Sequence, residues 1–293
     1  MQSENTEKEN LFSDKQIHFI NQLVTKGVLD VKELAEEMKV SRQTIYNYYF
    51  ALKNLVFERK KGKILLYERG PDTYLKRFAY NKEVKDKLAD YVVGKYINNY
   101  DTIFLDCGSS TLHIADQILE KELTDLTIIT TNPYVLQRLI NYKKLRELLV
   151  IGGIVNADSG AFWGPWTNTL LDHIEYQFQK AFLGIDGIQL QGSELHVMVS
   201  NTAELDQKSK VISKSGEIYI VFDDSKIDRG GNALFSVSKG RNALFSGSKE
   251  KAGEIKNIRY IVGHNDGGEM QKITEIQNIL GNKLEIVSLE NDF

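Results

Sequence analysis

The hydrophobic residues of the first 70 positions change from a helical spacing to a strand-like alternation. Three runs, at 13–26, 31–38 and 41–52, repeat apolar residues every three or four positions, which predicts three amphipathic helices. Ser41 stands where the N-cap of the third helix is expected. The segment 55–69 then alternates on either side of a glycine-containing turn, as a β-hairpin does. This order of elements predicts a winged helix-turn-helix.

Positive charge is concentrated on this amino-terminal segment. Residues 42–63 carry six cationic side chains against one carboxylate, Glu58, whereas the whole chain has a net charge of −3. In such folds a recognition helix enters the DNA major groove, so this placement predicts DNA binding. The alternatives are a solvated charged surface and a helix-turn-helix that contacts another protein. The predicted DNA-contacting residues are Ser41, Arg42, Gln43, Thr44, Tyr46, Asn47, Arg59, Lys60, Lys61 and Lys63.

From residue 81 onward the pattern changes to short apolar strands separated by helices. After a helix at 81–97, strands are predicted at 102–106, 126–130, 148–153, 180–188, 217–223, 258–263 and 283–289, with helices reaching about residues 121 and 147. Fully apolar strands that alternate with helices are typical of a parallel sheet buried on both faces. The predicted fold class is therefore α/β, a winged helix-turn-helix followed by a larger open, mostly parallel sheet. We expect a flexible tail at 1–10, the winged helix at 11–70, a linker at 71–80 and the α/β domain at 81–293.

Polar loops follow three of these strands. FLDCGSST (104–111) runs from a strand into a helix start, with Asp106 at the strand end, Gly108 in the turn, and the hydroxyls of Ser109, Ser110 and Thr111. Unpaired N–H groups and the helix dipole make such a turn suitable for phosphate, although a serine-rich turn is also an ordinary cap. The carboxyl ends of parallel strands share one edge, so two further loops should converge there. They contain Thr131 and Asn132, and Gly152 and Gly153.

Two more segments place charged side chains near that edge. Asp186 lies at the end of the predicted strand at 180–188, where it would either accept hydrogen bonds from sugar hydroxyls or cap a turn. Glu204 and Lys208 lie four residues apart on a predicted helix at 201–212. They are either a hydroxyl acceptor and a phosphate-binding cation, or an ordinary ion pair of the i,i+4 kind.

Several classes of protein are disfavoured by composition. The single cysteine, Cys107, forbids an intramolecular disulfide and fits a reducing compartment. The five histidines show no metal-ligand spacing, so neither a metal nor a cofactor is expected. The polar amino terminus is unlike a signal peptide and no apolar run is long enough to span a bilayer, which predicts a cytoplasmic protein without a membrane partner. A tandem match at 230–249, GGNALFSVSK followed by GRNALFSGSK, is interpreted as a duplication that lengthens a surface loop.

Taken in order, the motifs of the chain resemble those of the DeoR family of bacterial sugar-metabolism repressors. The resemblance runs through VKELAEEMKVSRQTI, DCGSST, TTN, IGGIVNADSGAFWGP, AFLGIDGI, AELDQKSKVI and FDDSK. It implies a winged helix followed by a domain similar to ribose-5-phosphate isomerase that binds phosphorylated sugars. It also implies an effector pocket formed by Asp106, Gly108, Ser109, Ser110, Thr111, Thr131, Asn132, Gly152, Gly153, Asp186, Glu204, Lys208 and Lys226.

The function implied by this resemblance is repression of a carbohydrate-utilisation operon under the control of a phosphorylated sugar. The partners would be double-stranded operator DNA and that sugar, and symmetric operators lead us to expect a homodimer or homotetramer. One departure concerns DNA: the family's recognition helix usually reads Thr-Ile-Arg-Arg-Asp-Leu, whereas Thr44-Ile45 is followed here by Tyr46-Asn47-Tyr48-Tyr49. The wing cations would compensate for the two missing arginines.

The alternative function is a sugar-phosphate isomerase that carries an accessory DNA-binding domain. Isomerisation needs a base within reach of a carbon-bound proton. The isomerases that the chain resembles carry an Asp-Glu pair where this chain has Asp186-Gly187. Because the second carboxylate is missing, no enzymatic activity is predicted.

Overall fold

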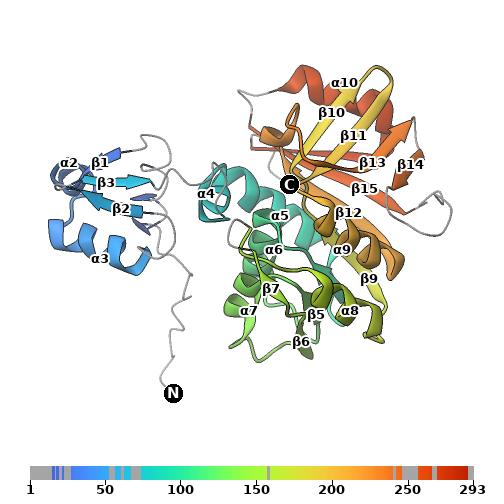
Figure 1. Cartoon of the computed structure of the whole chain (residues 1–293), viewed down its shortest axis with the longest axis horizontal. Helices are drawn as coiled ribbons and strands as arrows, with labels where there is room; N and C mark the ends of the chain where they lie inside the picture. The colour runs from blue at the N-terminus through green and yellow to red at the C-terminus, as the bar shows by residue number, and fades with distance from the viewer. Residues whose placement is uncertain are drawn as a thin grey trace. The chain divides into compact units, whose positions relative to one another are not determined.

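The computed structural model describes two compact units, residues 1–80 and 81–293, shown in Figure 1. The described residues are 15–16, 18–19, 22, 28–52, 57–60, 63–66, 74–156, 159–239, 242–245, 257–265 and 269–289. Within them, no helix combines the length and the apolar character that crossing a bilayer requires. Nor do these residues include a group of three or more His, Cys, Asp or Glu side chains placed to hold a metal ion.

The amino-terminal unit contains a helix-turn-helix and a small antiparallel sheet. Its elements are β1 (Val28–Asp30), α2 (Val31–Glu37), α3 (Arg42–Leu52), β2 (Phe57–Lys60), β3 (Lys63–Leu66) and α4 (Tyr74–Ala79), with strand order β1-β3-β2. The predicted second and third helices and the β2–β3 hairpin are therefore present. The predicted helix at 13–26 is helical at the five positions described there, and its other positions lie outside the described residues. β1 was not predicted, and α4 occupies part of the segment 71–80 expected to be a linker.

Local capping explains where the two helices of this motif begin. The Asp30 carboxylate accepts hydrogen bonds from the N–H groups of Lys32 and Glu33, and starts α2. The Ser41 hydroxyl accepts the N–H of Thr44 at 3.0 Å and starts α3 in the same way, as predicted. Leu34 on α2 and Ile45 on α3 are buried. Because Ile45 faces the interior of the unit, the opposite face of α3, with Gln43 and Asn47, is exposed.

The larger unit is built on a seven-stranded sheet in the order β16-β15-β12-β9-β4-β5-β6 (Figure 1), and every neighbouring pair in it is parallel. The strands are β4 (Thr102–Leu105), β5 (Thr127–Thr130), β6 (Glu147–Val150), β9 (Phe178–Leu183), β12 (Ser215–Asp223), β15 (Ile258–His264) and β16 (Leu284–Ser288). The helices are α5 (Lys82–Tyr96), α6 (Ser109–Glu120), α7 (Pro133–Leu139), α8 (Pro165–His173), α9 (Thr202–Ser213) and α10 (Met270–Leu280), with short 3-10 turns η1 (Asp224–Lys226) and η2 (Gly281–Lys283). The predicted α/β class is confirmed.

The central strands form a core with no solvent contact. Phe104 of β4, Ile129 of β5 and Ile220 of β12 are fully buried. The centre of each of these strands is apolar on both faces, because helices cover both sides of the sheet. All seven strands end at one edge, and the predicted polar loops follow β4, β5, β6 and β9 at that edge.

Three predictions about secondary structure were wrong in detail. The predicted strand at 180–188 is split: β9 ends at Leu183, and β10 (Gly187–Gln191) belongs to a second sheet. The helix expected to reach about residue 147 ends at Leu139, and turns lead from there to β6. The segment from residue 154 to α8, for which no strand was predicted, holds a small hairpin formed by β7 (Ile154–Val155) and β8 (Phe162–Trp163).

The tandem match at 230–249 also differs from its interpretation as a longer loop. The second sheet is antiparallel in the order β10-β11-β13-β14, with β11 at Glu194–Val199, β13 at Ala233–Lys239 and β14 at Asn242–Phe245. β13 carries the first copy and β14 the second, and the two pair with Ser236 opposite Phe245. Because both copies carry the same Asn-Ala-Leu-Phe sequence, the second copy has the same propensity to form a strand and adds to the sheet edge.

Candidate functional site

Asp106 is the residue that joins two loops at the carboxyl edge of the large sheet. It follows β4 and is buried, and its N–H donates to the carbonyl of Phe182 in β9 at 3.1 Å. Its carboxylate accepts the N–H of Gly184, just beyond β9, at 3.0 Å. The loops also touch at their glycines, since a Cβ on Gly108 would lie 3.5 Å from the Cα of Gly184. The turn before α6 is therefore fixed against the loop that leads to Asp186.

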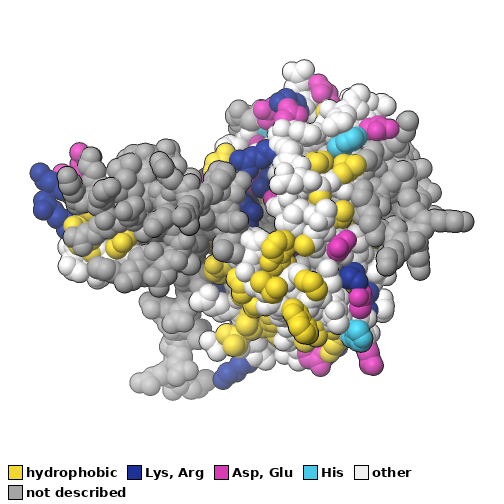
Figure 2. Space-filling view, viewed as in Figure 1, with side chains coloured by type: hydrophobic (Ala, Val, Ile, Leu, Met, Phe, Trp, Pro, Cys, Tyr) yellow, Lys and Arg dark blue, Asp and Glu magenta, His cyan; other side chains and the backbone are white. Residues whose placement is uncertain are grey.

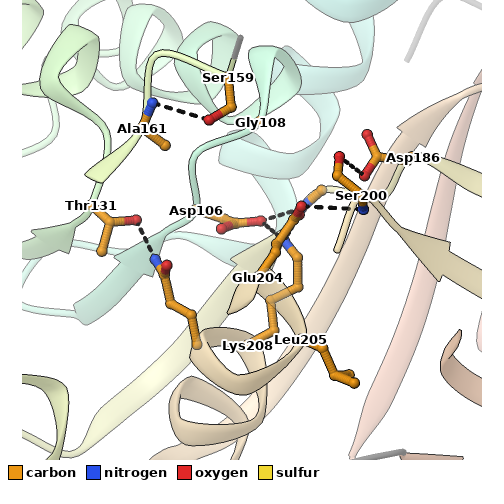
Figure 3. A network of polar contacts seen from close by, with 12 residues as sticks. Asp106, Gly108, Thr131, Ser159, Ala161, Asp186, Ser200, Glu204, Leu205 and Lys208 are labelled. Atoms are coloured by element: carbon orange, nitrogen blue, oxygen red, sulfur yellow. Dashed lines mark hydrogen bonds and ion pairs between the residues drawn. The ribbon is translucent and has the colours of Figure 1, made fainter. Parts of the chain in front are cut away.

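A chain of charged and polar side chains continues from Asp106 across α9, and Figure 3 shows it. Asp106 and Lys208 are buried, whereas Glu204, Ser200 and Asp186 are partly exposed. Lys208 on α9 forms ion pairs with Asp106 and, at 3.2 Å, with Glu204 one helical turn earlier. The second carboxylate oxygen of Glu204 accepts the N–H of Ser200 at 3.3 Å. The Ser200 hydroxyl in turn donates to Asp186 at 2.6 Å. The predicted ion pair between Glu204 and Lys208 is therefore present. It is linked to Asp106 through Lys208 and to Asp186 through Ser200.

Burial and mutual charge set the protonation of this network. Burial alone would lower the pKa of Lys208, but the negative charges of Asp106 and Glu204 raise it, so its ammonium stays protonated. Burial raises the pKa of Glu204, and the charges of Asp186 and Asp106 act in the same direction against the attraction of Lys208. One cation therefore serves several carboxylates, and the network has no positive charge left over for a phosphate.

The start of α6 provides the donors that this network lacks. Gly108 is the N-cap and has no side chain to accept from the first turn, so the N–H groups of Ser109 and Ser110 are available to an outside acceptor. Both serines lie close to the surface of the unit but are mostly buried. The Thr111 hydroxyl has a different role, because it donates to the carbonyls of Asp106 and Gly108, each at 2.6 Å, and closes the turn. The positive end of the helix dipole thus faces an uncapped turn.

The loop after β5 is held by its own side chains. The Thr131 hydroxyl accepts a hydrogen bond from Gln207 of α9 at 2.8 Å, and both side chains are buried. The Asn132 side chain accepts the N–H of Tyr134 at 2.9 Å and caps α7. The structure therefore brings Thr131 to α9 beside Lys208 and gives Asn132 a capping role.

The two glycines after β6 differ in their surroundings. A Cβ on Gly152 would meet nothing within 4 Å, whereas a Cβ on Gly153 would lie 2.0 Å from the Thr167 hydroxyl of α8. The same hydroxyl donates to the Gly152 carbonyl at 3.0 Å. Gly153 is therefore required by close packing against α8, and Gly152 faces open space.

Lys226 lies in η1, directly after β12, beside a second buried charge cluster. Asp223 accepts from the Asn81 side chain at 3.1 Å and pairs with Lys85 of α5 at 3.7 Å. Burial would raise the pKa of Asp223, but the charges of Lys85 and Lys226 and hydrogen bonds from Ser225 and Asn81 lower it. The charge of Lys226 thus helps to lower the pKa of Asp223, whereas Lys208 forms its ion pair with Asp106.

Four residues of the site were not predicted from the sequence: Gly184, Ser200, Gln207 and Thr167. Ser200 and Asn201 precede Glu204 in a capping arrangement, in which the Asn201 side chain accepts the N–H of Glu204 at 2.9 Å. The pattern Asn-x-x-Glu before a helix signals this cap. Gln207 and Thr167 carry no charge and belong to no motif, so only the folded structure reveals them.

The candidate DNA-contacting residues of α3 lie on its exposed face. Ser41, Arg42, Gln43 and Asn47 are exposed, whereas Thr44 and Tyr46 are partly buried. The Gln43 amide donates to the Asn47 side chain at 3.1 Å, so these two side chains lie together one helical turn apart. Arg59, Lys60 and Lys63 belong to the β2–β3 hairpin, whose side chains, like Lys61 as a whole, lie outside the described residues.

Comparisons with known proteins agree on the class of regulator. The "Uncharacterized HTH-type transcriptional regulator FruR" of Bacillus subtilis is 27% identical over 211 residues, covering 71% of this chain and 80% of its own. A lactose phosphotransferase system repressor of Staphylococcus epidermidis is 28% identical over 229 residues, covering 74% and 84%. The L-fucose operon activator of Haemophilus influenzae is 24% identical over 216 residues, covering 73% and 82%.

Among solved structures, ribose-5-phosphate isomerase A of Methanocaldococcus jannaschii aligns with a TM-score of 0.34 and 22% identity. The alignment covers 50% of this chain and 55% of the isomerase chain. Residues 80–245 match the family described as the DeoR C terminal sensor domain. This match spans more than half of the chain and includes the Asp106–Lys208 network, and the chain therefore belongs to the DeoR family.

Proposed function

We propose that the chain is a DNA-binding transcriptional repressor of a carbohydrate-utilisation operon, and that a phosphorylated sugar bound at the carboxyl edge of the large sheet controls it. The observation that carries this proposal is the juxtaposition of two features at one edge. An uncapped helix start supplies N–H donors for an anion, and the partly exposed carboxylates of Asp186 and Glu204 supply acceptors for hydroxyls. A sugar phosphate carries both groups that this pair of features would recognise.

The phosphate is assigned to the first turn of α6 rather than to Lys208. Lys208 is only 1% exposed and already pairs with Asp106 and Glu204, so it has no capacity for a further anion. The N–H groups of Ser109 and Ser110 point out of a helix start, where phosphate is stabilised by donors and dipole together. Asp186 and Glu204 then accept the sugar hydroxyls, since charged acceptors make the stronger hydrogen bonds.

Gly108→Asp tests the phosphate position directly. An added Cβ would find only ordinary contacts at Gly108, and we expect the aspartate carboxylate to cap α6 itself. We expect the unfolding free energy to stay within about 1 kcal/mol of the wild type. Sugar-phosphate affinity, measured by calorimetry, should fall by roughly tenfold or more. A fixed carboxylate at the start of α6 would occupy the position proposed for the phosphate and would repel it.

Gly108→Ala is the matched control for bulk. It adds the same Cβ without a charge or a cap, and sugar-phosphate binding should survive it. If Gly108→Asp bound the ligand as tightly as the wild type, the phosphate would have to lie elsewhere.

A sugar-phosphate isomerase remains the rival function, because a buried lysine among carboxylates resembles an acid–base centre. The geometry after Asp186 argues against it. A Cβ at Gly187 would lie 1.9 Å from the carbonyl oxygen of Arg229, so this backbone leaves no room for a second carboxylate there. We propose that the chain binds its ligand without converting it. We expect no turnover of pentose or hexose phosphates in a coupled assay, and measurable isomerisation that Asp186→Asn abolished would contradict the proposal.

A further inference from the structure

The segment after β6 exposes a cluster of large hydrophobic side chains that the effector site does not use. Ile154 and Val155 of β7 are 54% and 57% exposed, and Trp166 and Leu170 of α8 are 72% and 47% exposed. We call these four residues the α8 patch. Figure 2 shows hydrophobic side chains gathered on the face of the larger unit that carries β7 and α8. Each aliphatic or aromatic group left in water costs free energy that burial would recover.

The α8 patch is also depleted of charge. Between Ile151 and Leu171 the sequence contains a single charged residue, Asp158. The nearest ion pair on α8 is that of Asp172 with Lys210, beyond the patch. Loss of charge at the centre, with tryptophan enriched, is the composition of the buried core of a protein–protein interface.

We propose that the α8 patch is the surface through which two copies of this chain associate. The four side chains offer on the order of 400 Å² of apolar area, about half of the roughly 800 Å² that each partner of a stable dimer buries. The polar neighbours of the patch would supply the rim. A second copy also meets a need of the proposed function, since the described residues of one chain contain one helix-turn-helix and a two-fold operator would require two.

The patch is attached to the loops of the effector site by backbone hydrogen bonds. The N–H of Phe162 in β8 donates to the carbonyl of Thr131 at 2.9 Å, and Thr131 is bonded through its side chain to Gln207 of α9. On the other side, Thr167 of α8 holds the Gly152 carbonyl. A dimer formed through this surface would place each effector site one loop away from the partner. This coupling and the choice of a second copy as the partner rest on the proposed function, whereas the exposure and the low charge of the α8 patch do not.

The experiment is sedimentation of the full chain, without DNA or sugar, at micromolar concentration. We expect the wild type to sediment as at least two chains of 33.4 kDa. Trp166→Glu should raise the dissociation constant roughly a hundredfold, because it places a charge at the centre of an apolar contact. If the wild type forms a tetramer, the same substitution should remove one association step and leave a dimer.

Two controls separate an interface from damage to the fold. Met270→Glu at the start of α10, where the methionine is 49% exposed, changes an exposed hydrophobic residue outside the patch and should leave association unchanged. Trp166→Lys should dissociate like Trp166→Glu, because either charge would have to be desolvated in an apolar contact. A monomeric wild type, or a Trp166→Glu variant that associates as well as the wild type, would overturn the proposal.

Discussion

Lys208→Met is expected to destabilise the larger unit by about 3–5 kcal/mol, because removing one member of a buried ion pair leaves the other charges uncompensated. Asp106 would keep its hydrogen bond from Gly184 but lose its only cationic partner among the contacts described for it. Glu204 and Asp186 would then repel Asp106 without a cation between them. Urea unfolding followed by circular dichroism measures the loss.

Lys210→Met is the matched control on the same helix. Lys210 pairs with Asp172, but their side chains are 30% and 51% exposed, and such pairs contribute about 0–1 kcal/mol. The combination of Lys208→Met with Asp106→Asn should recover part of the lost unfolding free energy, since the uncompensated charge of Asp106 is removed as well. Equal losses for Lys208→Met and Lys210→Met would show that the buried network does not hold the site together.

Two double substitutions in the winged helix should weaken DNA binding in different ways. Gln43→Ala with Asn47→Ala removes the paired amides on the exposed face of α3. If they read base edges, affinity for the operator should fall by about 1–3 kcal/mol per contact while affinity for unrelated DNA stays unchanged. The measurement is a binding titration on both kinds of DNA.

Lys61→Ala with Lys63→Ala should instead lower affinity for every DNA sequence. Each lost phosphate contact reduces the slope of log affinity against log salt by about 1, so the double variant should lose up to about 2. The two pairs serve as controls for each other. If the slope of log affinity against log salt stayed unchanged after the lysines were replaced, the wing would not contact DNA.

The sequence predicted most of the larger unit because its signals were local. Buried strands such as β4 and β5 are apolar at their centres, and the polar residues that follow them mark the edge of the sheet where the candidate site lies. The i,i+4 spacing of Glu204 and Lys208 also predicted their ion pair. What could not be predicted depends on contacts between residues far apart in the sequence. Examples are the ion pair of Lys208 with Asp106, 102 residues away, and the hydrogen bond from Gln207 to Thr131.

The errors in secondary structure have a related cause. The strand predicted at 180–188 is a mostly apolar run that covers parts of both β9 and β10. Only Gly184 and Asp186, which lie between these two strands, mark the break after Leu183. The helix after β5 ends at Leu139 because the chain must turn to pair β6 with β5, starting with Glu147 beside Thr127. Short strands such as β7 and β8 exist through their pairing with each other, and a two-residue strand leaves no periodicity in a sequence.

The central claim is that an anion at the start of α6 changes DNA occupancy. The direct test measures the affinity of the full chain for an operator selected from random DNA, with and without a sugar phosphate identified by thermal-shift screening. We predict that the sugar phosphate changes the wild-type affinity by roughly fivefold or more and leaves the affinity of Gly108→Asp unchanged. An equal response of both proteins, or none in the wild type to any sugar phosphate, would contradict the account.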